Sequence, residues 1–295
     1  MTLNQYELNQ SPFFRLRSKS KLADLLQSSK RKMISLAKSD KPYQRWPKKK
    51  ASGGVREIAA PRGDLSALQS RISDLLGRVE KPAYLFAPRK GVSYVDNAAA
   101  HLISSEIVTI DIKDFFANCS SNYVKLFFLN KMECSPDVAA ILTELSTLEG
   151  RLPQGSPASP VLSFLSYQDM WDEISQLCQK SGCMFSLYID DITISGRSVP
   201  GRLVWQVRRL LGQYGHVANA RKTQRRRNRP MRVTGVIVHR GRLLLPNRQH
   251  KKYADLKAAL ADAKDENRSA DLRRRLVGHR AQAAQISSRN RRRGR

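Results

Sequence analysis

"FSLYIDDITIS", residues 185–195, places two adjacent carboxylates, Asp190 and Asp191, between two apolar runs rich in β-branched and aromatic residues. Such runs on either side of polar residues predict two strands joined by a tight turn at the aspartates. At ~4 Å, repulsion between two carboxylates costs on the order of several kcal/mol at intermediate dielectric. A solvated turn without chemistry is the plain alternative, so the pair alone does not decide between a surface turn and a cation site.

A second acidic strand end favours the cation site. The run IVTIDI, residues 107–112, predicts a buried strand that carries Asp111 near its end. If this strand neighbours the hairpin, Asp111, Asp190 and Asp191 converge. Hard oxygen ligands without His or Cys suit Mg²⁺, and two such ions about 4 Å apart form a clamp for in-line displacement at phosphorus. We expect one ion to activate the attacking hydroxyl and the other to stabilise a pyrophosphate leaving group, with Asp114 as a backbone-positioning or surface residue.

The charge of the chain predicts a polyanionic partner. The 295 residues carry a net charge of +28, and residues 221–295 hold 24 Lys and Arg against 5 Asp and Glu, a net charge of +19. Neutralised phosphates release counterions, so nucleic acid is the expected partner. No apolar run reaches the roughly 18 residues of a membrane span, and we expect neither a membrane partner nor a secretory signal. Four cysteines in a chain of this size predict reduced packing residues and a cytoplasmic location.

Helical and strand-like patterns are mixed without strict βαβ alternation, which predicts an α+β fold. Leucine spacing predicts helices over 64–79, with Asp64 as N-cap, and over 135–148, 161–180 and 199–214, followed by two amphipathic helices from Lys251 onward. Residues 232–246 predict a strand, a turn at Arg240 and Gly241, and a second strand. Residues 287–295 are too polar to pack and predict disorder.

Three short motifs carry a resemblance to a known family. YIDD between two strands, DIKDFF (111–116) before it and LPQGSPASP (152–160) between them resemble, in this order, the palm of a reverse transcriptase. NAAAH (97–101) resembles the NAxxH element of retron reverse transcriptases, and VTG (233–235) resembles their signature after the palm. The resemblance runs from about residue 11 to 250.

The resemblance implies a right-hand polymerase fold. Its expected parts are fingers over 1–105, a palm over 106–240 that contains an antiparallel sheet with the Asp-Asp hairpin, and a small helical thumb with a basic tail over 241–295. It makes Asp111, Asp190 and Asp191 the catalytic and metal-binding residues of a two-Mg²⁺ site. The hairpin departs from the family in having Ile189 where Ala or Val is common. The extra bulk of isoleucine is expected to affect fidelity or processivity and to leave the reaction itself unchanged.

The same resemblance implies four nucleotide-binding residues. Phe116 is expected to exclude a 2′-hydroxyl, although a core phenylalanine is the alternative. Gln154 is expected near nucleotide and template, in what would otherwise be an ordinary Pro/Gly loop. Lys222 is expected to face phosphates and Arg56 to grip the triphosphate, and either residue is otherwise a solvated cation.

The retron elements imply an RNA-binding group. His101 alone would be a capping or core histidine, and as part of NAxxH it is expected to brace RNA-contacting structure. Thr234 and Gly235 could otherwise belong to a strand and a bend. The group consists of Asn97, His101, Val233, Thr234 and Gly235.

The function implied is that of a retron reverse transcriptase. Such an enzyme copies part of its cognate structured non-coding RNA into single-stranded DNA from dNTPs, primes from an internal 2′-hydroxyl to leave a branched RNA–DNA (msDNA), and serves in anti-phage defence. A separate effector protein and a host RNase H are further expected partners. Two alternatives stay open: a group II intron-like or abortive-infection reverse transcriptase, and a non-catalytic RNA-binding protein with a polymerase fold.

Overall fold

The structure, a computed structural model, describes residues 5–38, 41–49 and 53–291 and divides into two compact units. Unit 1 comprises Met1–Arg89, Ile112–Ile174 and Arg208–Ala218, and unit 2 comprises Lys90–Asp111, Ser175–Val207 and Asn219–Arg295. The units are interleaved along the chain, and helices α9 (Gln168–Lys180) and α10 (Gly201–Gln213) run through the division. The expected division into fingers, palm and thumb stays a prediction.

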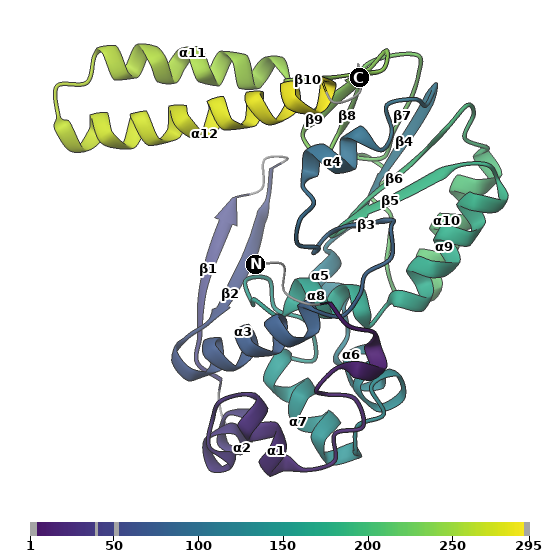
Figure 1. The fold of residues 1–295 in the computed structure, drawn as a ribbon, viewed down its shortest axis with the longest axis vertical. Coiled ribbons are helices and arrows are strands. Elements are labelled where there is room, and N and C mark those ends of the chain that lie inside the picture. Colours follow the sequence, from purple (N-terminus) through teal and green to yellow (C-terminus); the bar gives the residue numbers. More distant parts are fainter. Residues whose placement is uncertain (1–4, 39–40, 50–52, 292–295) are drawn as a thin grey trace. The chain divides into compact units, whose positions relative to one another are not determined.

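Unit 1 is mainly helical and includes one β-hairpin, β1–β2, which lies to one side of its helices (Figure 1). Its strands β1 (Tyr43–Lys49) and β2 (Val55–Pro61) pair antiparallel, with Trp46 opposite Ile58. Apolar residues at helical spacing fill its core, including Leu65, Ile72 and Leu76. The other elements are η1 (Leu8–Gln10), α1 (Lys19–Leu25), α2 (Lys30–Lys38), α3 (Gly63–Gly77), β3 (Leu85–Ala87), α5 (Phe115–Asn118), α6 (Ser121–Leu126), the π-helical turn η2 (Phe127–Lys131), α7 (Pro136–Ser146) and α8 (Ser159–Leu165).

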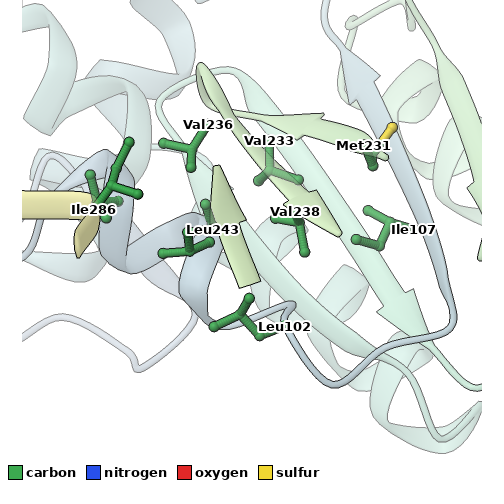
Figure 2. Close-up of a cluster of buried hydrophobic side chains, with 10 residues drawn as sticks. Leu102, Ile107, Met231, Val233, Val236, Val238, Leu243 and Ile286 are labelled. Carbon is green, nitrogen blue, oxygen red and sulfur yellow. The ribbon is translucent and has the colours of Figure 1, made fainter. Parts of the chain in front are cut away.

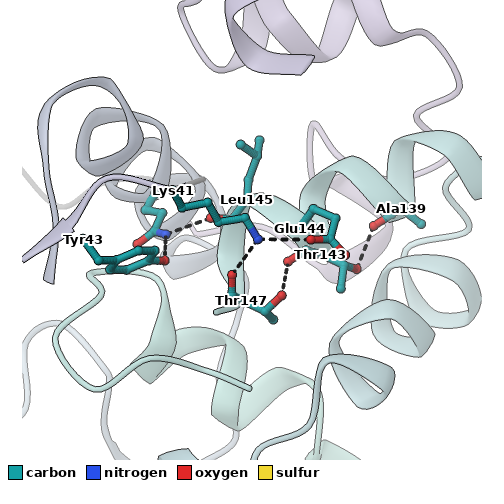
Figure 3. Close-up of polar contacts among 8 residues, drawn as sticks. Lys41, Tyr43, Ala139, Thr143, Glu144, Leu145 and Thr147 are labelled. Atoms are coloured by element: carbon teal, nitrogen blue, oxygen red, sulfur yellow. Dashed lines mark hydrogen bonds and ion pairs between the residues drawn. The ribbon is translucent and has the colours of Figure 1, made fainter. Parts of the chain in front are cut away.

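Polar contacts tie the start of β1 to the end of α7 and to α3 (Figure 3). The Lys41 ammonium donates to the carbonyl of Thr147 at 3.0 Å and to Glu144 at 3.1 Å. The buried Gln69 amide donates to the Tyr43 hydroxyl at 2.7 Å and to the carbonyl of Leu145 at 2.8 Å. These bonds satisfy carbonyls at the C-terminal end of α7 that would otherwise lack a helical partner.

Unit 2 contains two antiparallel sheets. In the first, β5 (Met184–Tyr188), β6 (Asp191–Gly196), β4 (Glu106–Asp111) and β7 (Gln224–Arg227) lie side by side in that order. In the second, β9 (Val236–His239) lies between β8 (Met231–Val233) and β10 (Arg242–Leu244). This arrangement, with helices in both units, confirms the α+β class.

One apolar core joins the second sheet of unit 2 to helix α4 (Tyr94–Ala99) and to the last helix of the chain. Val233, Val236 and Leu243 from the sheet pack with Ile107 of β4 and with Ile286 (Figure 2). Helices α11 (Asn247–Ala261) and α12 (Glu266–Arg291) pack against each other through a small separate cluster (Figure 1), which consists of Leu256, Leu272 and Leu276.

Several predicted boundaries are wrong. The helix expected over 161–180 is two helices, α8 and α9, because the chain turns at Ser166 and the buried Tyr167, whose hydroxyl accepts a bond from the Ser120 amide at 3.0 Å. Asp64 lies in the first turn of α3 and is not its N-cap, a position that Arg62 takes. A carboxylate in the first turn still favours the helix through its dipole.

The polar end of the chain is also ordered further than its composition predicts. Residues 287–291 belong to α12, where Arg289 pairs with Asp96 of α4 and the Asn290 side chain bonds both the amide and the carbonyl of Leu243. Residues 292–295 of the predicted disordered tail lie outside the described residues. The four cysteines are free and buried, as predicted, and burial raises the pKa of Cys134 to about 11. Within the described part of the chain, no helix is long and apolar enough to cross a bilayer.

Candidate active site

Three aspartates of unit 2 meet at one end of two neighbouring strands. Asp111 of β4 and Asp191 of β6 are direct cross-strand partners, and Tyr188 of β5 pairs with Asp191 on its other side. These pairings leave Ile189 and Asp190 as a two-residue turn. The Asp111 strand therefore neighbours the Asp-Asp hairpin, which is the condition under which the three aspartates were expected to converge.

The turn itself is strained at Ile189. Its φ is +58°, in the left-handed region that β-branched residues avoid because the side chain crowds its own backbone. Such a conformation costs on the order of 1–3 kcal/mol and is found where function requires it. The pairing of Tyr188 with Asp191 fixes the length of the turn, so the strain places Asp190 at the tip beside Asp191.

The pKa values of two of these aspartates are raised, first by burial and then by neighbouring carboxylates. Burial, followed by the charges of Asp191 and Asp111, raises the pKa of Asp190 to about 7. Desolvation and the charge of Asp111 raise the pKa of Asp191 to about 6, although Asp191 as a residue is solvent-exposed. Both shifts favour the neutral acid, and a positive charge at this end of the sheet would counter them.

One ammonium group partly supplies that charge. The Lys222 Nζ atom lies 3.0 Å and 3.2 Å from the two carboxylate oxygens of Asp111. The backbone amide of Asn219 donates to the Asp111 carbonyl at 2.7 Å, which holds the segment of Lys222 beside the strand end. The side chain of Lys222 is 43% exposed and can leave this position without opening a core.

The donor set suits a hard divalent cation. Within the described ranges, no three His, Cys, Asp or Glu side chains form a preassembled metal site. Asp111, Asp190 and Asp191 nevertheless bring carboxylate oxygens alone to one strand end, and the Lys222 ammonium stands where a cation would be attracted. The residues therefore fit Mg²⁺ by their chemistry.

The other three predicted nucleotide-binding residues lie in unit 1, and their roles stay predictions. Phe116 is half-buried, with its ring centroid 5.5 Å from that of Phe115. Arg56 is a half-buried residue of β2. The backbone carbonyl of Gln154 accepts from the Ala59 amide of β2 at 2.8 Å.

The next residue explains why this loop contains glycine. Gly155 has φ +129°, and a Cβ there would lie 2.8 Å from the carbonyl oxygen of Ala59. Only glycine allows so close an approach of the loop to β2. The LPQG segment is thus held on the β-hairpin of unit 1 with the Gln154 side chain half-buried.

The two retron-like elements, NAAAH and VTG, contact each other. Thr234 and Gly235 form the two-residue turn between β8 and β9, with φ of +44° and +90°. The Thr234 hydroxyl donates to the carbonyl of Tyr94 at 2.9 Å, and the Asn97 amide donates to that hydroxyl at 3.3 Å. The single strand predicted before Arg240 is therefore two strands, because the sequence pattern did not mark Thr-Gly as a tight turn.

His101 is buried between two strands of the first sheet. Its Nδ1 lies 2.7 Å from the Ser195 hydroxyl of β6, and its Nε2 lies 2.7 Å from the Ser186 hydroxyl of β5. Burial lowers the pKa of His101 to about 4, so the ring is neutral near pH 7. Asn97, His101 and Val233 are fully buried. Their placement suits bracing of the hairpin, and RNA binding by this group stays a prediction.

Sequence reasoning missed the polar partners of these residues. Ser186 and Ser195 occupy buried positions of two apolar strands. A hydroxyl at a buried strand position needs a hydrogen-bond partner, and this was the sequence signal for a contact such as that with His101. Glu106, at the start of β4, is another buried group: it accepts from the Val199 amide at 2.6 Å and pairs with Arg225 of β7 at 2.8 Å. The Arg225 hydrogen bond is the leading cause of its lowered pKa.

Comparison with known proteins defines the class. Residues 46–238 match the family described as "Reverse transcriptase (RNA-dependent DNA polymerase)", a span of more than half the chain that includes all three aspartates. The chain belongs to this family.

Three similar proteins are named as retron reverse transcriptases. The chain is 29% identical over 210 residues to the Retron Se72 reverse transcriptase of Salmonella heidelberg, covering 67% of this chain and 55% of the relative. It is 26% identical over 212 residues to the Retron Ec86 reverse transcriptase of Escherichia coli, covering 70% and 64%. It is 32% identical over 216 residues to the Retron Mx65 reverse transcriptase of Myxococcus xanthus, covering 64% and 49%. The chain thus spans between about half and two-thirds of the length of these relatives.

Proposed function

We propose that this chain is an RNA-directed DNA polymerase of the retron type. It copies part of a cognate structured RNA into single-stranded DNA, starting from a 2′-hydroxyl of that RNA, and acts in anti-phage defence. The observation that carries the polymerase proposal is the pairing of Asp111 with Asp191, beside Asp190, within a chain that belongs to the reverse transcriptase family. The similarity to retron enzymes supports the proposal that the template is a structured RNA and that the primer is a 2′-hydroxyl of the same RNA.

The three carboxylates would hold divalent cations, for which Mg²⁺ is the best fit. When bound, these cations supply positive charge that lowers the pKa of the primer hydroxyl and neutralises the triphosphate. The chain contributes the position of the carboxylates through the β4–β6 register and the two-residue turn. Because the pKa values of Asp190 and Asp191 are raised, protons would compete with the cations for these carboxylates, and cation binding would release them.

Lys222 has a separate role in the proposal. Its ammonium neutralises Asp111 while no other cation is bound, and its exposed stem lets it turn to a phosphate oxygen. From there it can donate a proton to the departing pyrophosphate as the bond between the α-phosphorus and the bridging oxygen breaks. Loss of this donor slows turnover but leaves cation binding to the carboxylates intact.

Primer extension tests the polymerase. The purified full-length chain, given an RNA template, a DNA primer, dNTPs and Mg²⁺, is expected to extend the primer. Asp190→Asn is expected to abolish extension while RNA binding in a filter assay persists. The matched control is Asp74→Asn on α3, an exposed aspartate in unit 1, which is expected to behave as wild type. Extension by Asp190→Asn would overturn the metal assignment.

A cellular assay tests the retron assignment. Cells expressing the gene with its native flanking DNA are expected to contain one discrete single-stranded DNA that changes size after RNase treatment and is lost with Asp190→Asn. If that DNA is absent while the purified chain extends an ordinary primer on RNA, the chain is a reverse transcriptase of another type, such as an abortive-infection enzyme. Binding of RNA without any extension would instead favour the non-catalytic alternative.

A change at Phe116 tests the predicted sugar selection. Phe116→Ala is expected to admit ribonucleotides, because the smaller side chain leaves room for a 2′-hydroxyl. The measurement is incorporation of rNTPs relative to dNTPs in the same extension assay. Phe115→Leu serves as the core control, since Phe115 is 3% exposed and changes there should alter stability without changing the ratio.

A further inference from the structure

Unit 2 contains a cavity of about 390 Å³ whose lining residues include none of the predicted site residues. It lies where the start of β4, the end of β7 and the β9–β10 turn meet. The amide of Asn228 donates to the carbonyl of Ser105 at 2.7 Å, which joins two of its walls. Asn228 and Arg240 both have positive φ, +52° and +46°, so two tight turns shape the opening.

One side of this cavity is apolar. Leu102, Ile107 and Val238 line it and are 7%, 4% and 3% exposed, as members of the core shared by α4 and the second sheet (Figure 2). Ile103, also in the lining, is 81% exposed. These side chains and Ile103 give the cavity an apolar wall that the faces of a nucleobase can contact.

The other side is cationic. Arg226, Arg229 and Arg240 line the cavity and are exposed, and no Asp or Glu occurs among its lining residues in the described part of the chain. Arginine both binds phosphate in a bidentate manner and stacks on bases. The hydroxyls of Ser104 and Ser105 add groups that can bond the polar edge of a base.

We propose that this cavity binds one unpaired nucleotide of an RNA strand, with the base against Leu102, Ile107 and Val238 and the flanking phosphates on Arg226, Arg229 and Arg240. A paired nucleotide would keep its base inside the duplex and could not use the apolar wall, so the site favours single-stranded or bulged RNA over a helix. The charge of the lining favours RNA over a peptide as the occupant. The proposal rests on the proposed function only in taking RNA to be the nucleic acid that the chain binds.

Photocrosslinking locates the nucleotide. The probe is a 20-nucleotide unstructured, uridine-rich RNA that contains 4-thiouridine, and the competitor is a fully paired RNA hairpin of equal length. Irradiation of the full-length chain with this probe, followed by mass spectrometry, is expected to mark peptides that contain residues 102–107 or 238–241. The hairpin is expected to compete poorly for these crosslinks. Crosslinks confined to other segments would overturn the proposal.

Two matched triple variants distinguish RNA binding in the cavity from attraction of RNA to the positive charge of the whole chain. The triple variant Arg226→Ala, Arg229→Ala, Arg240→Ala is expected to bind the probe about tenfold more weakly at roughly 0.15 M salt, with a shallower dependence on salt. The control Arg197→Ala, Arg202→Ala, Arg242→Ala removes three charges from exposed residues outside the cavity and is expected to lose less than about threefold. Equal losses in the two triple variants would show a diffuse basic surface and overturn the cavity site.

A third variant keeps every charge. Ser105→Trp places an indole in the lining and is expected to remove the crosslink at residues 102–107 and 238–241 while the melting temperature stays near that of wild type. An unchanged crosslink would contradict the proposal, and if the variant does not fold, the two arginine variants decide. Primer extension on an ordinary template is measured for all three variants. A cavity variant that still extends the primer but no longer binds the probe supports the cavity site. A wild-type chain that binds no RNA would overturn both the cavity site and the proposed function.

Discussion

Two tight turns in unit 2 both begin with a β-branched residue of positive φ and differ in the contacts of that side chain. The Asp-Asp hairpin turns at Ile189, and the VTG hairpin turns at Thr234, both β-branched residues with positive φ. The Thr234 hydroxyl bonds the Tyr94 carbonyl and accepts from Asn97, so polar contacts offset its strain. Ile189 has no polar side-chain atom with which to do the same, and the turn it opens carries a carboxylate of raised pKa.

The difference fits a structural role for the turn at Thr234 and the proposed catalytic role for the turn at Ile189. At Thr234, hydrogen bonds between the hydroxyl and neighbouring groups offset the backbone strain. They also hold this turn of the second sheet against α4. At the Asp-Asp turn, the strain at Ile189 and the crowded carboxylates are the features that the proposed cation would offset.

The largest expected effect is at the Asp-Asp turn. Asp190→Asn is expected to lower the rate of primer extension by at least about a thousandfold, because one oxygen donor of the cation site loses its charge. The fold is expected to survive, since the change removes a desolvated carboxylate crowded by Asp191 and Asp111. Single-turnover extension and thermal melting in the same buffer give both values. A rate within tenfold of wild type would remove Asp190 from the catalytic set.

Two groups of unit 2, Asp190 and His101, are expected to respond to pH in opposite directions. The pKa of Asp190 is raised, so without a divalent cation its charged form destabilises the fold as pH rises from about 4 to about 7. The pKa of His101 is lowered from 6.5 to about 4, so its part of the stability is present above pH 6.5 and is lost as pH falls toward 4.

The His101 effect is measured by difference. Between pH 7 and pH 4, urea unfolding of wild type is expected to lose up to roughly 3 kcal/mol more than that of His101→Gln. The variant removes only this histidine and leaves His216, which shifts in the same direction. Parallel pH curves for the two proteins would show that His101 is not buried as a neutral ring.

Removal of the polar contacts at the structural turn is expected to have a smaller effect. Thr234→Ala leaves a residue with positive φ that lacks its two hydroxyl contacts and is expected to lower the free energy of unfolding by about 2 kcal/mol. Thr234→Ser keeps the hydroxyl and is the matched control, with an expected loss below about 1 kcal/mol. Urea unfolding at pH 7 distinguishes them, and equal losses would show that the hydroxyl does not stabilise the turn.

The smallest effect is the sharpest test of the comparison. Ile189→Gly relieves strain that no side-chain bond offsets and is expected to raise the free energy of unfolding by about 0.5–1 kcal/mol. Thr234→Gly relieves strain but loses the hydroxyl contacts and is expected to lower it by about 1 kcal/mol. The same substitution thus has opposite signs in the two turns. A loss of stability in Ile189→Gly would mean that the isoleucine side chain packs well enough to outweigh its backbone strain.

Much of this site was predictable from short patterns. The aspartates and their strands are local signals, since β-branched runs and paired carboxylates are visible within ten residues. The strands on either side of Asp190, the strand that ends at Asp111 and helices α3 and α7 followed from local sequence patterns. The errors lie where a local pattern cannot decide: the break at Tyr167, the turn at Thr234, and the order of residues 287–291, which depends on Asp96 and Leu243.

The sequence by itself determined the chemistry of the site: which residues carry carboxylates, that only oxygen donors are available, and that the chain as a whole is strongly cationic. The tertiary structure alone decided which of these groups meet. Strand register placed Asp111 opposite Asp191, Lys222 reached Asp111 from 111 residues away, and Asn97 reached Thr234 from 137 residues away. Contacts of this kind depend on the pairing of distant segments, because the free energy that holds them comes from burial and hydrogen bonds formed only in the folded chain.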